Sequence, residues 1–372
     1  MKRKTLTPIA LLTLCAGTIH AIEPLKEDVG YTQRFAQRVM ASGDTNGDGK
    51  FEKAENAELW EKNKKYDRNR DGAIDAEEIG RYSLKYVTGT GRQLHNVLFK
   101  RVDGEGVYLD FYFPEVDDSN KKPVVVYTHG GGWAAGSKQG AGNASFDKVH
   151  GALLKQGFCV VSVGYRLVKK EQGTAMRDCV IDSKDAVRFI SAHKDELGVD
   201  PMRIYTFGDS AGGHLAQMLL FAPPESLPGD PELAKYAYKT VAGVSWYGPC
   251  DFENEQLFNH DDRANFRDRF GARILTSDST PEDKPALYRE MSPVNYLTQE
   301  SPPLLMIQGD KDTTIPVKHA YHMQKKAEEL KAPVEIMIVK NAGHNWRSVD
   351  APIAPSRNEI IDRTVRFFVD HQ

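Results

Sequence analysis

Three polar residues, far apart in the sequence, stand in surroundings typical of nucleophilic catalysis. Ser210 lies at the centre of Gly208-Asp-Ser-Ala-Gly212, between an apolar run that ends at Phe207 and a helix-like run. Small residues two positions before and after the serine let a strand and a helix approach closely, so that a tight turn lifts the serine oxygen above a sheet. This context predicts a nucleophile elbow instead of an ordinary glycine-rich turn.

An acid and a base follow the serine along the chain. His344 comes just after an apolar run, and Asp312 lies in a loop that follows another apolar run. A serine attacks a carbonyl only when a base removes its proton, and a carboxylate fixes the tautomer of that base. We therefore expect Ser210, Asp312 and His344 to form a catalytic triad. Asp310 competes for the role of the acid, and the position of Asp312 relative to Ile315 favours Asp312.

A glycine-rich loop upstream could stabilise negative charge on a reacting oxygen. The segment His129-Gly-Gly-Gly-Trp133 ends an apolar run. Consecutive glycines let backbone N–H groups face a ligand without interference from Cβ atoms. We expect the amides of Gly131 and Gly132, together with that of Ala211 after the nucleophile, to form the oxyanion hole. His129 is expected to hold this loop in shape.

Two twelve-residue segments near the N-terminus, Asp44–Glu55 and Asp67–Glu78, match the pattern of an EF-hand calcium loop. Oxygen ligands at fixed positions and a glycine at the sixth suit Ca²⁺. The expected ligands are Asp44, Asn46, Asp48, the Lys50 carbonyl and Glu55 in the first loop, and Asp67, Asn69, Asp71, the Ala73 carbonyl and Glu78 in the second. We expect up to two structural calcium ions, with Phe51 and Ile74 joining the loops through a short strand contact.

The elements that must position the triad can be read from alternating patterns after about Gln93. Strand-like segments fall at 94–101, 107–113, 123–128, 158–165, 203–207, 241–246, 303–307 and 334–339, and helix-like segments at 144–155, 176–195, 211–221, 317–330 and 357–370. Strands that alternate with helices predict an α/β fold with a mostly parallel sheet. Residues 251–298 are polar and irregular, and we expect them to form a cap or rim over the carboxyl edge of the sheet.

The chain from about residue 95 to 370 resembles the HGGG-type bacterial carboxylesterases, the hormone-sensitive-lipase-like and bacterial feruloyl/acetyl esterase group. The resemblance rests on His129-Gly-Gly-Gly-Trp133, Ser162-Val-Gly-Tyr-Arg166, Gly208-Asp-Ser-Ala-Gly-Gly-His214, Tyr247-Gly-Pro249 and Gly343-His344. It implies an α/β-hydrolase fold, hydrolysis of carboxylic esters without an organic cofactor, and the same triad and oxyanion residues. The chain departs from the group at Gln308, where many relatives carry His, and at Cys250.

Several further residues are expected to support the fold. His214 lies on the helix behind the nucleophile, and we expect it to be structural. The resemblance implies the same for Tyr165 and Arg166. Four aromatic residues either line an aromatic acyl pocket or belong to the core, and the sequence leaves both readings open: Trp133, Tyr247, Phe252 and Trp346.

The sequence also predicts domains and a compartment. A basic start and a short apolar run make residues 1–21 a predicted signal peptide, followed by an EF-hand pair at 22–90 and an α/β-hydrolase domain at 91–372. We therefore expect a secreted or periplasmic protein without stable membrane insertion after signal removal. The net charge of -3 gives no reason to expect a nucleic-acid partner. Cys159 is expected to be a buried free thiol, whereas Cys179 and Cys250 could pair.

The leading interpretation is a secreted serine carboxylesterase that acts through an acyl-enzyme, with acetyl or feruloyl esters on polysaccharide as expected substrates. One alternative is a serine peptidase of the oligopeptidase type, because its elbow is similar. Another is a calcium-dependent adhesion or scaffold protein with a vestigial hydrolase domain. The glycine-rich loop favours esters over peptides, and the complete triad argues against a vestigial domain.

Overall fold

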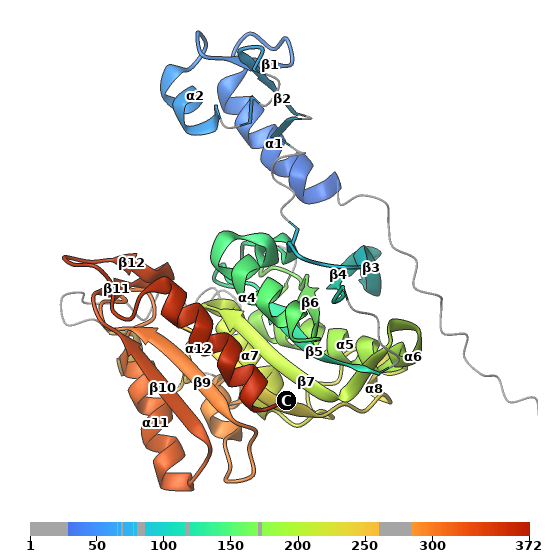
Figure 1. Ribbon diagram of the computed structural model, residues 1–372, viewed down its shortest axis with the longest axis vertical. Helices are drawn as coiled ribbons and strands as arrows, with labels where there is room; N and C mark the ends of the chain where they lie inside the picture. The colour runs from blue at the N-terminus through green and yellow to red at the C-terminus, as the bar shows by residue number, and fades with distance from the viewer. Residues whose placement is uncertain are drawn as a thin grey trace, which may run out of the picture.

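The computed structural model describes residues 29–64, 66–67, 70–76, 78–79, 86–115, 120–169, 173–259 and 284–372. The predicted signal peptide, the expected calcium ligand Asn69 and residues 260–283 of the predicted cap lie outside the described residues. The described residues between 29 and 79 form a small helical unit, called here the N-terminal unit. Residues 93–370 form the larger sheet domain (Figure 1).

The sheet domain is built on one eight-stranded sheet. Its strands are β3 (Gln93–Val102), β4 (Glu105–Tyr112), β5 (Lys122–Thr128), β6 (Cys159–Val163), β7 (Val199–Asp209), β8 (Thr240–Trp246), β9 (Leu304–Gly309) and β10 (Val334–Val339), in the order β10-β9-β8-β7-β5-β6-β4-β3. The six strands from β10 to β6 are parallel, and β4 runs antiparallel to both β6 and β3. The expected mostly parallel sheet of eight strands is confirmed.

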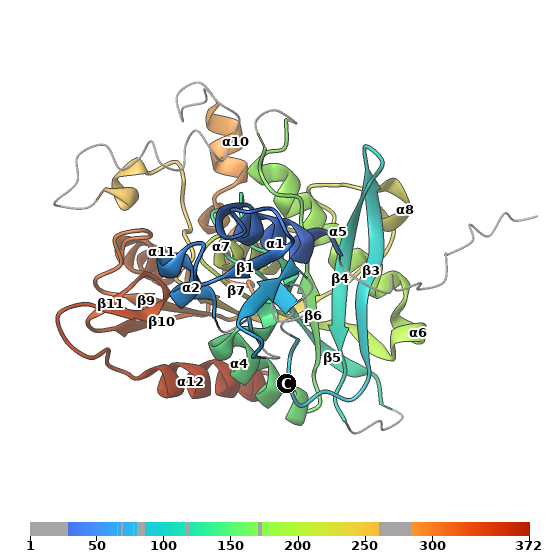
Figure 2. The same cartoon turned by 90° about the horizontal axis from the view of Figure 1, so that it is seen from above.

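Helices and short helical turns connect the strands. The α-helices are α4 (Ala144–Lys155), α5 (Met176–Ala192), α6 (Lys194–Leu197), α7 (Ala211–Phe221), α8 (Pro231–Ala234), α10 (Pro285–Glu290), α11 (Lys318–Leu330) and α12 (Arg357–Asp370). The 3-10 turns are η1 (Lys138–Gly142), η3 (Glu255–Phe258), η4 (Pro293–Tyr296) and η5 (His344–Trp346). A small ribbon of β11 (Ala342–Gly343) and β12 (Arg347–Ser348) flanks η5. Figure 2 shows α10 on one side of the sheet domain, opposite α12.

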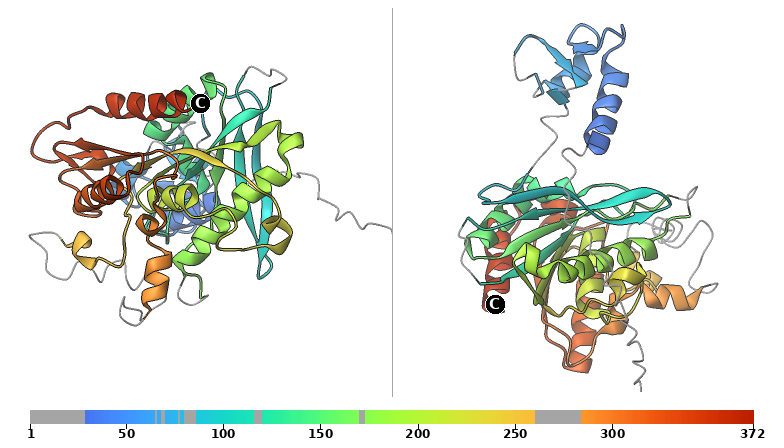
Figure 3. Two further views of the ribbon diagram at one scale, coloured as in Figure 1. Left: turned by 90° about the horizontal axis from the view of Figure 1, so that it is seen from below. Right: turned by 90° about the vertical axis from the view of Figure 1, so that its right-hand side faces the viewer.

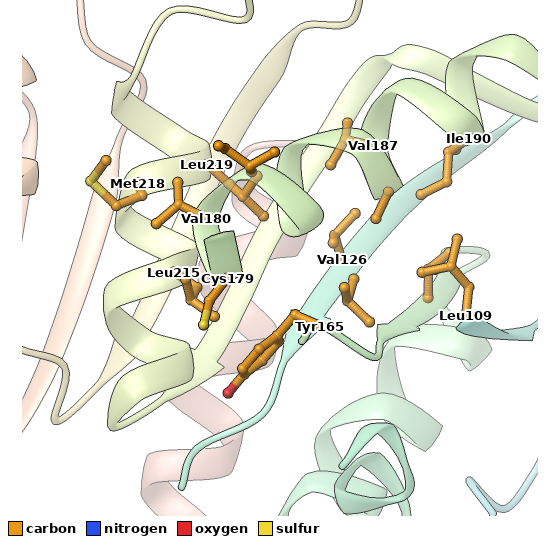
Figure 4. Packing of buried hydrophobic residues seen from close by; sticks show 14 of the residues in the cluster. Leu109, Val126, Tyr165, Cys179, Val180, Val187, Ile190, Leu215, Met218 and Leu219 are labelled. Carbon is orange, nitrogen blue, oxygen red and sulfur yellow. The ribbon is translucent and has the colours of Figure 1, made fainter. Parts of the chain in front are cut away.

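The central strand β5 explains why the sheet is covered on both faces. All of its residues are buried, and alternate side chains enter different cores, because successive residues of a strand point to opposite faces. Val124 and Val126 join the core formed with α5 and α7, whereas Val125 and Tyr127 join the core formed with α4 and α12. Figure 4 shows side chains of α5 and α7 packed beside Val126. A third cluster lies between α11 and the strands β9 and β10.

The N-terminal unit builds a separate, smaller core. It contains α1 (Val29–Gly43), β1 (Lys50–Glu52), α2 (Ala57–Asn63) and β2 (Ala73–Asp75), and Figure 3 shows it as a unit distinct from the sheet domain. Strands β1 and β2 pair antiparallel with Phe51 opposite Ile74, so the expected strand contact between the two loops is confirmed. Both side chains are fully buried, and the Phe51 ring meets the edge of Trp60.

The cysteines correct one expectation and confirm another. Cys159, Cys179 and Cys250 are all buried free thiols. The expectation for Cys159 is therefore confirmed, whereas the suggested pairing of Cys179 with Cys250 is wrong. The Cys179 thiol donates to the Arg166 carbonyl, and the Cys250 thiol to the His319 carbonyl, so each satisfies its donor within its own neighbourhood. Among the described residues, no helix is long and apolar enough to cross a membrane.

Candidate functional site

Ser210 occupies a tight turn between β7 and α7. Its φ of 53° and ψ of -120° lie outside the regions that most residues adopt. Two glycines make the turn possible. A Cβ atom on Gly208 would lie 2.2 Å from the Gly212 carbonyl oxygen, and one on Gly212 would lie 1.9 Å from the Thr128 carbonyl oxygen. The strand–turn–helix context expected for a nucleophile elbow is therefore present.

The structure brings the three predicted triad residues together. His344 Nε2 lies 3.0 Å from Ser210 Oγ, and His344 Nδ1 lies 2.7 Å from Asp312 Oδ2. These are hydrogen-bond distances. The contacts fit an imidazole that donates from Nδ1 to the carboxylate and accepts the serine proton at Nε2. The geometry can therefore carry a proton from the serine to the histidine.

Asp312, and not Asp310, takes the contact with His344. Asp312 is 1% exposed, and its Oδ1 accepts the backbone N–H groups of Thr314 and Ile315 at 2.8 and 2.9 Å. Asp310 Oδ1 is buried and has no hydrogen-bond partner among the described residues. Gln308 Nε2 donates to Asp312 Oδ2 at 3.2 Å and to the Ile315 carbonyl at 2.7 Å. Gln308, at the position where many members of the resembling esterase group carry His, thus helps to orient the acid.

The glycine-rich loop lies beside the elbow because β5 and β7 are neighbours. Thr128 at the end of β5 pairs with Gly208 near the end of β7. Gly131 and Gly132 follow with φ of +127° and +58°, backbone conformations that favour glycine. A Cβ atom on Gly131 would lie 2.1 Å from the Ala135 carbonyl oxygen. Gly131, Gly132 and the first residue of α7, Ala211, are thus brought to the same end of the two strands.

Asp209 helps to position the glycine-rich loop, a role that the sequence did not predict. Its Oδ1 accepts the Gly130 N–H at 2.9 Å and the Tyr127 hydroxyl at 3.0 Å, and the residue is 8% exposed. Burial raises the Asp209 pKa to about 6, opposed by these two hydrogen bonds. The available signal was an acidic residue beside the nucleophile at the end of a buried strand. Asp209 ties the start of the glycine-rich loop to the elbow.

His129 and Tyr165 hold the same loop from the other side. The Tyr165 hydroxyl donates to the His129 carbonyl at 2.6 Å, and the two rings stack with centroids 4.2 Å apart. Burial lowers the pKa of His129 to about 4, so the ring is neutral at neutral pH. Arg166 donates from Nε and Nη2 to the carboxylate of Asp182. The contacts agree with the structural roles expected for these residues.

The four aromatic residues left open by the sequence are core residues. They are between 1% and 4% exposed: Trp133, Tyr247, Phe252 and Trp346. Tyr247 meets both His344 and Trp346 edge to face, with ring centroids 4.7 Å apart in each pair. Such contacts fix the ring of His344 from one side. A second constraint, which the sequence did not indicate, comes from Arg357, whose guanidinium donates to the Asn345 and Trp346 carbonyls.

The first EF-hand-like loop is held by its own acidic side chains. Asp44 accepts the N–H groups of Gly47 and Gly49, and Glu55 accepts those of Thr45 and Asn46. Gly49 has φ of +86°, as a sharp turn at the sixth loop position requires. Within the described ranges, no three His, Cys, Asp or Glu side chains gather in a metal-binding arrangement.

The second loop is partly described. Asp67 Oδ2 accepts the Gly72 N–H at 3.2 Å, whereas Asp67 Oδ1 is buried without a hydrogen-bond partner among the described residues. Asp71 Oδ1 accepts the Ala73 N–H, and Glu78 Oε2 accepts the Asp75 N–H. A buried carboxylate oxygen without a donor suits a cation, and the oxygen-only donor set of both loops suits Ca²⁺.

Known proteins resemble this chain in sequence. The family model BD-FAE matches residues 109–327. The chain is 28% identical over 281 residues to esterase LipC of Mycobacterium tuberculosis, and this alignment covers 74% of the chain and 66% of LipC. It is 25% identical over 264 residues to the isoprenylcysteine alpha-carbonyl methylesterase ICME of Arabidopsis thaliana, covering 69% of the chain and 58% of ICME. The chain thus spans less than two thirds of the length of these curated relatives.

Solved structures resemble the sheet domain in fold. One is esterase 2 of Thermogutta terrifontis phosphonylated by sarin, with a TM-score of 0.62 and 23% identity over 77% of the chain and 96% of the esterase. Another is a truncated carbohydrate esterase from gut microbiota, with a TM-score of 0.61 and 21% identity over 77% of the chain and 98% of that protein. Both likenesses support the α/β-hydrolase fold of the sheet domain.

Proposed function

This chain belongs to the BD-FAE family, and we propose that it is a serine carboxylesterase with Ser210 as nucleophile, His344 as base and Asp312 as orienting acid. The observation that carries the proposal is the continuous hydrogen-bond path from Ser210 Oγ through His344 to Asp312 Oδ2, at 3.0 and 2.7 Å. The esterase names of the relatives support the same reaction class.

In the first half of the reaction, Ser210 Oγ attacks the carbonyl carbon of the ester while His344 Nε2 takes the serine proton. The carbonyl oxygen becomes an oxyanion, which the amides of Gly131, Gly132 and Ala211 stabilise. One such donor is worth about 3 kcal/mol of the barrier. Asp312 stabilises the imidazolium. Collapse of the intermediate breaks the ester C–O bond, and the alcohol leaves with the proton from His344.

In the second half, a water molecule takes the place of the alcohol. His344 Nε2 accepts a proton from the water as its oxygen attacks the acyl carbon, and the same amides stabilise the second oxyanion. The serine oxygen leaves and recovers its proton from His344. The products are one carboxylic acid and one alcohol, and the enzyme is regenerated.

Hydrolysis of p-nitrophenyl acetate and butyrate tests the proposal. We expect Ser210→Ala to lose at least 10³-fold in kcat, because the covalent step disappears. Ser42→Ala, at an exposed serine of α1 in the N-terminal unit, is the matched control and should keep the rate of the parent. An organophosphonate should label the peptide that contains Ser210 and no other serine. Equal rates in the parent and Ser210→Ala, or faster cleavage of peptide amides than of esters, would contradict the proposal.

For the substrate, we propose acetyl or feruloyl esters on polysaccharide. One of the structural relatives is a carbohydrate esterase from gut microbiota, and this likeness supports the proposed substrate class. A panel of acetylated xylan, feruloylated sugars and simple acyl esters tests it. The expected result is a higher kcat/KM on the carbohydrate esters than on a simple ester with the same acyl group, and the reverse order would contradict it.

For the N-terminal unit, we propose an EF-hand pair that binds up to two structural calcium ions. The support is the buried, unpartnered Asp67 Oδ1, the left-handed glycines at the sixth loop positions and the pairing of Phe51 with Ile74. The oxygens of Asp44, Asn46, Asp48 and Glu55 would hold one ion, and those of Asp67, Asn69, Asp71 and Glu78 the other, with carbonyls from Lys50 and Ala73. Calcium would neutralise the acidic loops and hold them together.

We also propose that the protein is exported to the periplasm or the exterior, on the pattern of residues 1–21. The N-terminal residue of the protein isolated from its native compartment tests this. An N-terminus near Ile22 is expected, and a retained Met1 would contradict the proposal.

A further inference from the structure

His214 lies one helical turn after the nucleophile and contacts segments that enter the site from both sides. Its backbone N–H donates to the Ser210 carbonyl at 3.1 Å. The indole N–H of Trp133, in the glycine-rich loop, donates to His214 Nδ1 at 3.3 Å. On the opposite side, His214 Nε2 lies 2.8 Å from the carbonyl of Met291, at the end of α10. The side chain is fully buried.

One tautomer satisfies both side-chain contacts. Trp133 can only donate and the Met291 carbonyl can only accept, so Nδ1 must be the acceptor and Nε2–H the donor. Burial lowers the pKa of His214 to about 4, which keeps the ring neutral at neutral pH. The imidazole therefore links the glycine-rich loop at Trp133 to the segment after α10 at Met291.

The loop segment that His214 holds is under backbone strain. Gly132 and Trp133 are consecutive residues with φ of +58° and +56°, and the left-handed conformation is unfavourable for a tryptophan. The backbone on the far side of this turn is fixed by Val168, whose N–H donates to the Trp133 carbonyl at 2.8 Å. The indole is 1% exposed and packs edge to face on His214. The side-chain anchor therefore opposes relaxation of the turn that carries the oxyanion glycines.

The described ends of the predicted cap converge on the same ring. Phe252, where the chain leaves β8, meets His214 and Trp133 edge to face, with centroids 5.2 and 5.9 Å apart. Met291, where the chain returns, accepts the Nε2 hydrogen bond. Ser292 Oγ then accepts the Phe252 N–H at 2.8 Å, which ties the two ends together. His214 is thus the point at which nucleophile helix, glycine-rich loop and cap ends meet.

We propose that His214 is a positioning residue for ester hydrolysis: through Trp133 it sets the oxyanion amides of Gly131 and Gly132 against Ser210, and through Met291 it fixes the cap ends to the same frame. This inference rests on the proposed function. It differs from a general packing role because it requires the Trp133–His214 hydrogen bond itself, and not only the two rings.

Two substitutions separate the hydrogen bond from the packing. Trp133→Phe keeps an aromatic ring and removes the N–H donor, and His214→Phe keeps a ring and removes both hydrogen bonds. We expect kcat per active site, titrated with an organophosphonate, to fall about tenfold in Trp133→Phe and about 100-fold in His214→Phe, since a misplaced oxyanion donor costs part of the 10²–10³-fold that its removal costs. KM should change less than threefold. The double variant should be no slower than His214→Phe, because the hydrogen bond that Trp133→Phe removes is already lost in His214→Phe.

Thr364→Val is the matched control. It removes the buried acceptor of another indole N–H, that of Trp246, at 2.9 Å on the other face of the sheet. It should lower the melting temperature while titrated kcat stays at the parent value. If Trp133→Phe also keeps the parent kcat while melting lower, His214 has a packing role and the inference is overturned, whether or not His214→Phe folds. Equal turnover in the parent and in Ser210→Ala would instead overturn the proposed function. This pair is therefore measured before the His214 and Trp133 variants.

Discussion

The N-terminal unit and the sheet domain use acidic side chains in opposite ways. In the first EF-hand-like loop, Asp44 and Glu55 are only partly buried and accept backbone N–H groups of the loop itself. In the sheet domain, Asp182 and Asp185 are fully buried and share the ammonium of Lys100 at 2.8 and 2.7 Å. The sheet domain supplies its own counter-charge, whereas the two acids of the N-terminal unit bind the backbone of their own loop.

The two regions also differ in the core that supports these charges. Among the described residues, the core of the N-terminal unit consists of Ala36, Val39, Phe51, Trp60, Tyr66, Ile74 and Ile79. The sheet domain has three larger clusters on both faces of its sheet. A small domain buries too little apolar surface for a large stability margin, so ligand binding should matter more in the N-terminal unit.

Replacing one Asp by Asn in each region should give the largest difference in kcat between the two regions. Asp312→Asn should lower kcat about 10⁴-fold, because an amide no longer fixes the productive tautomer of His344. Asp44→Asn should change kcat on p-nitrophenyl acetate less than twofold. The measurement is the steady-state rate per organophosphonate-titrated site. A comparable loss in Asp44→Asn would show that the N-terminal unit acts on the triad, and the contrast between the regions would fail.

Acid should destabilise the sheet domain selectively. Burial lowers the pKa of His129, His150 and His214 to about 4 and that of His319 to about 3. Below pH 6.5 the unfolded chain binds protons that these folded histidines do not bind, so stability falls as pH drops towards 4. A depression from 6.5 to about 4 is worth about 3 kcal/mol for each histidine.

The raised pKa of Asp209 works in the opposite direction. Its value of about 6, against 3.8 for an ordinary carboxyl, means that the folded protein binds the extra proton between pH 6 and 3.8, which offsets part of the loss. The sequence holds no histidine between residues 22 and 90. Urea unfolding at pH 7, 6, 5 and 4 should show a steep decline for the sheet domain and not for the N-terminal unit. Equal declines would mean that the buried histidines are not its cause.

Calcium removal should have the reverse selectivity. At a free calcium concentration 100 times the Kd, binding stabilises a folded site by about 2.7 kcal/mol, which a chelator removes. EDTA should lower the melting temperature of the N-terminal unit and leave that of the sheet domain unchanged. Calorimetry with and without EDTA measures both transitions. Glu55→Gln should reduce the response, whereas Glu329→Gln, at an exposed acid of α11, should retain it. A response confined to the sheet domain would place the ion elsewhere.

The smallest expected effect is the fall in melting temperature when one N-cap side chain is removed from each region. Asn56 accepts the Leu59 N–H at the start of α2, and Ser356 accepts the Glu359 N–H at the start of α12. Replacing either by Ala should cost about 1 kcal/mol. Because the unfolding entropy grows with domain size, the melting temperature should fall by about 4–8 °C in the N-terminal unit and about 2–4 °C in the sheet domain. Equal shifts would indicate that the two regions unfold as one.

Local patterns predicted much of the fold. The helices at 144–155, 211–221 and 357–370 and the strand at 334–339 match the observed bounds, because hydrophobic period and flanking turn residues act over a few neighbours. The neighbouring positions of β5 and β7, the hydrogen bond from Gly130 to Asp209 and the contact of Trp133 with His214 join residues about 80 positions apart. Such contacts depend on the order of strands in the sheet, which leaves no local pattern. The choice between Asp310 and Asp312 as the partner of His344 likewise depends on how one loop turns.

The three buried thiols can report where the sheet domain opens, because each can be alkylated only after the structure around it opens. Cys159, Cys179 and Cys250 are 0% exposed, and burial raises the pKa of each, so alkylating reagents find neither access nor thiolate in the closed state. All three belong to the sheet domain, on β6, on α5 and just after β8. The order in which the three thiols are alkylated therefore shows which part of the sheet domain opens first. The N-terminal unit has no cysteine between residues 29 and 79 and does not react with the reagent.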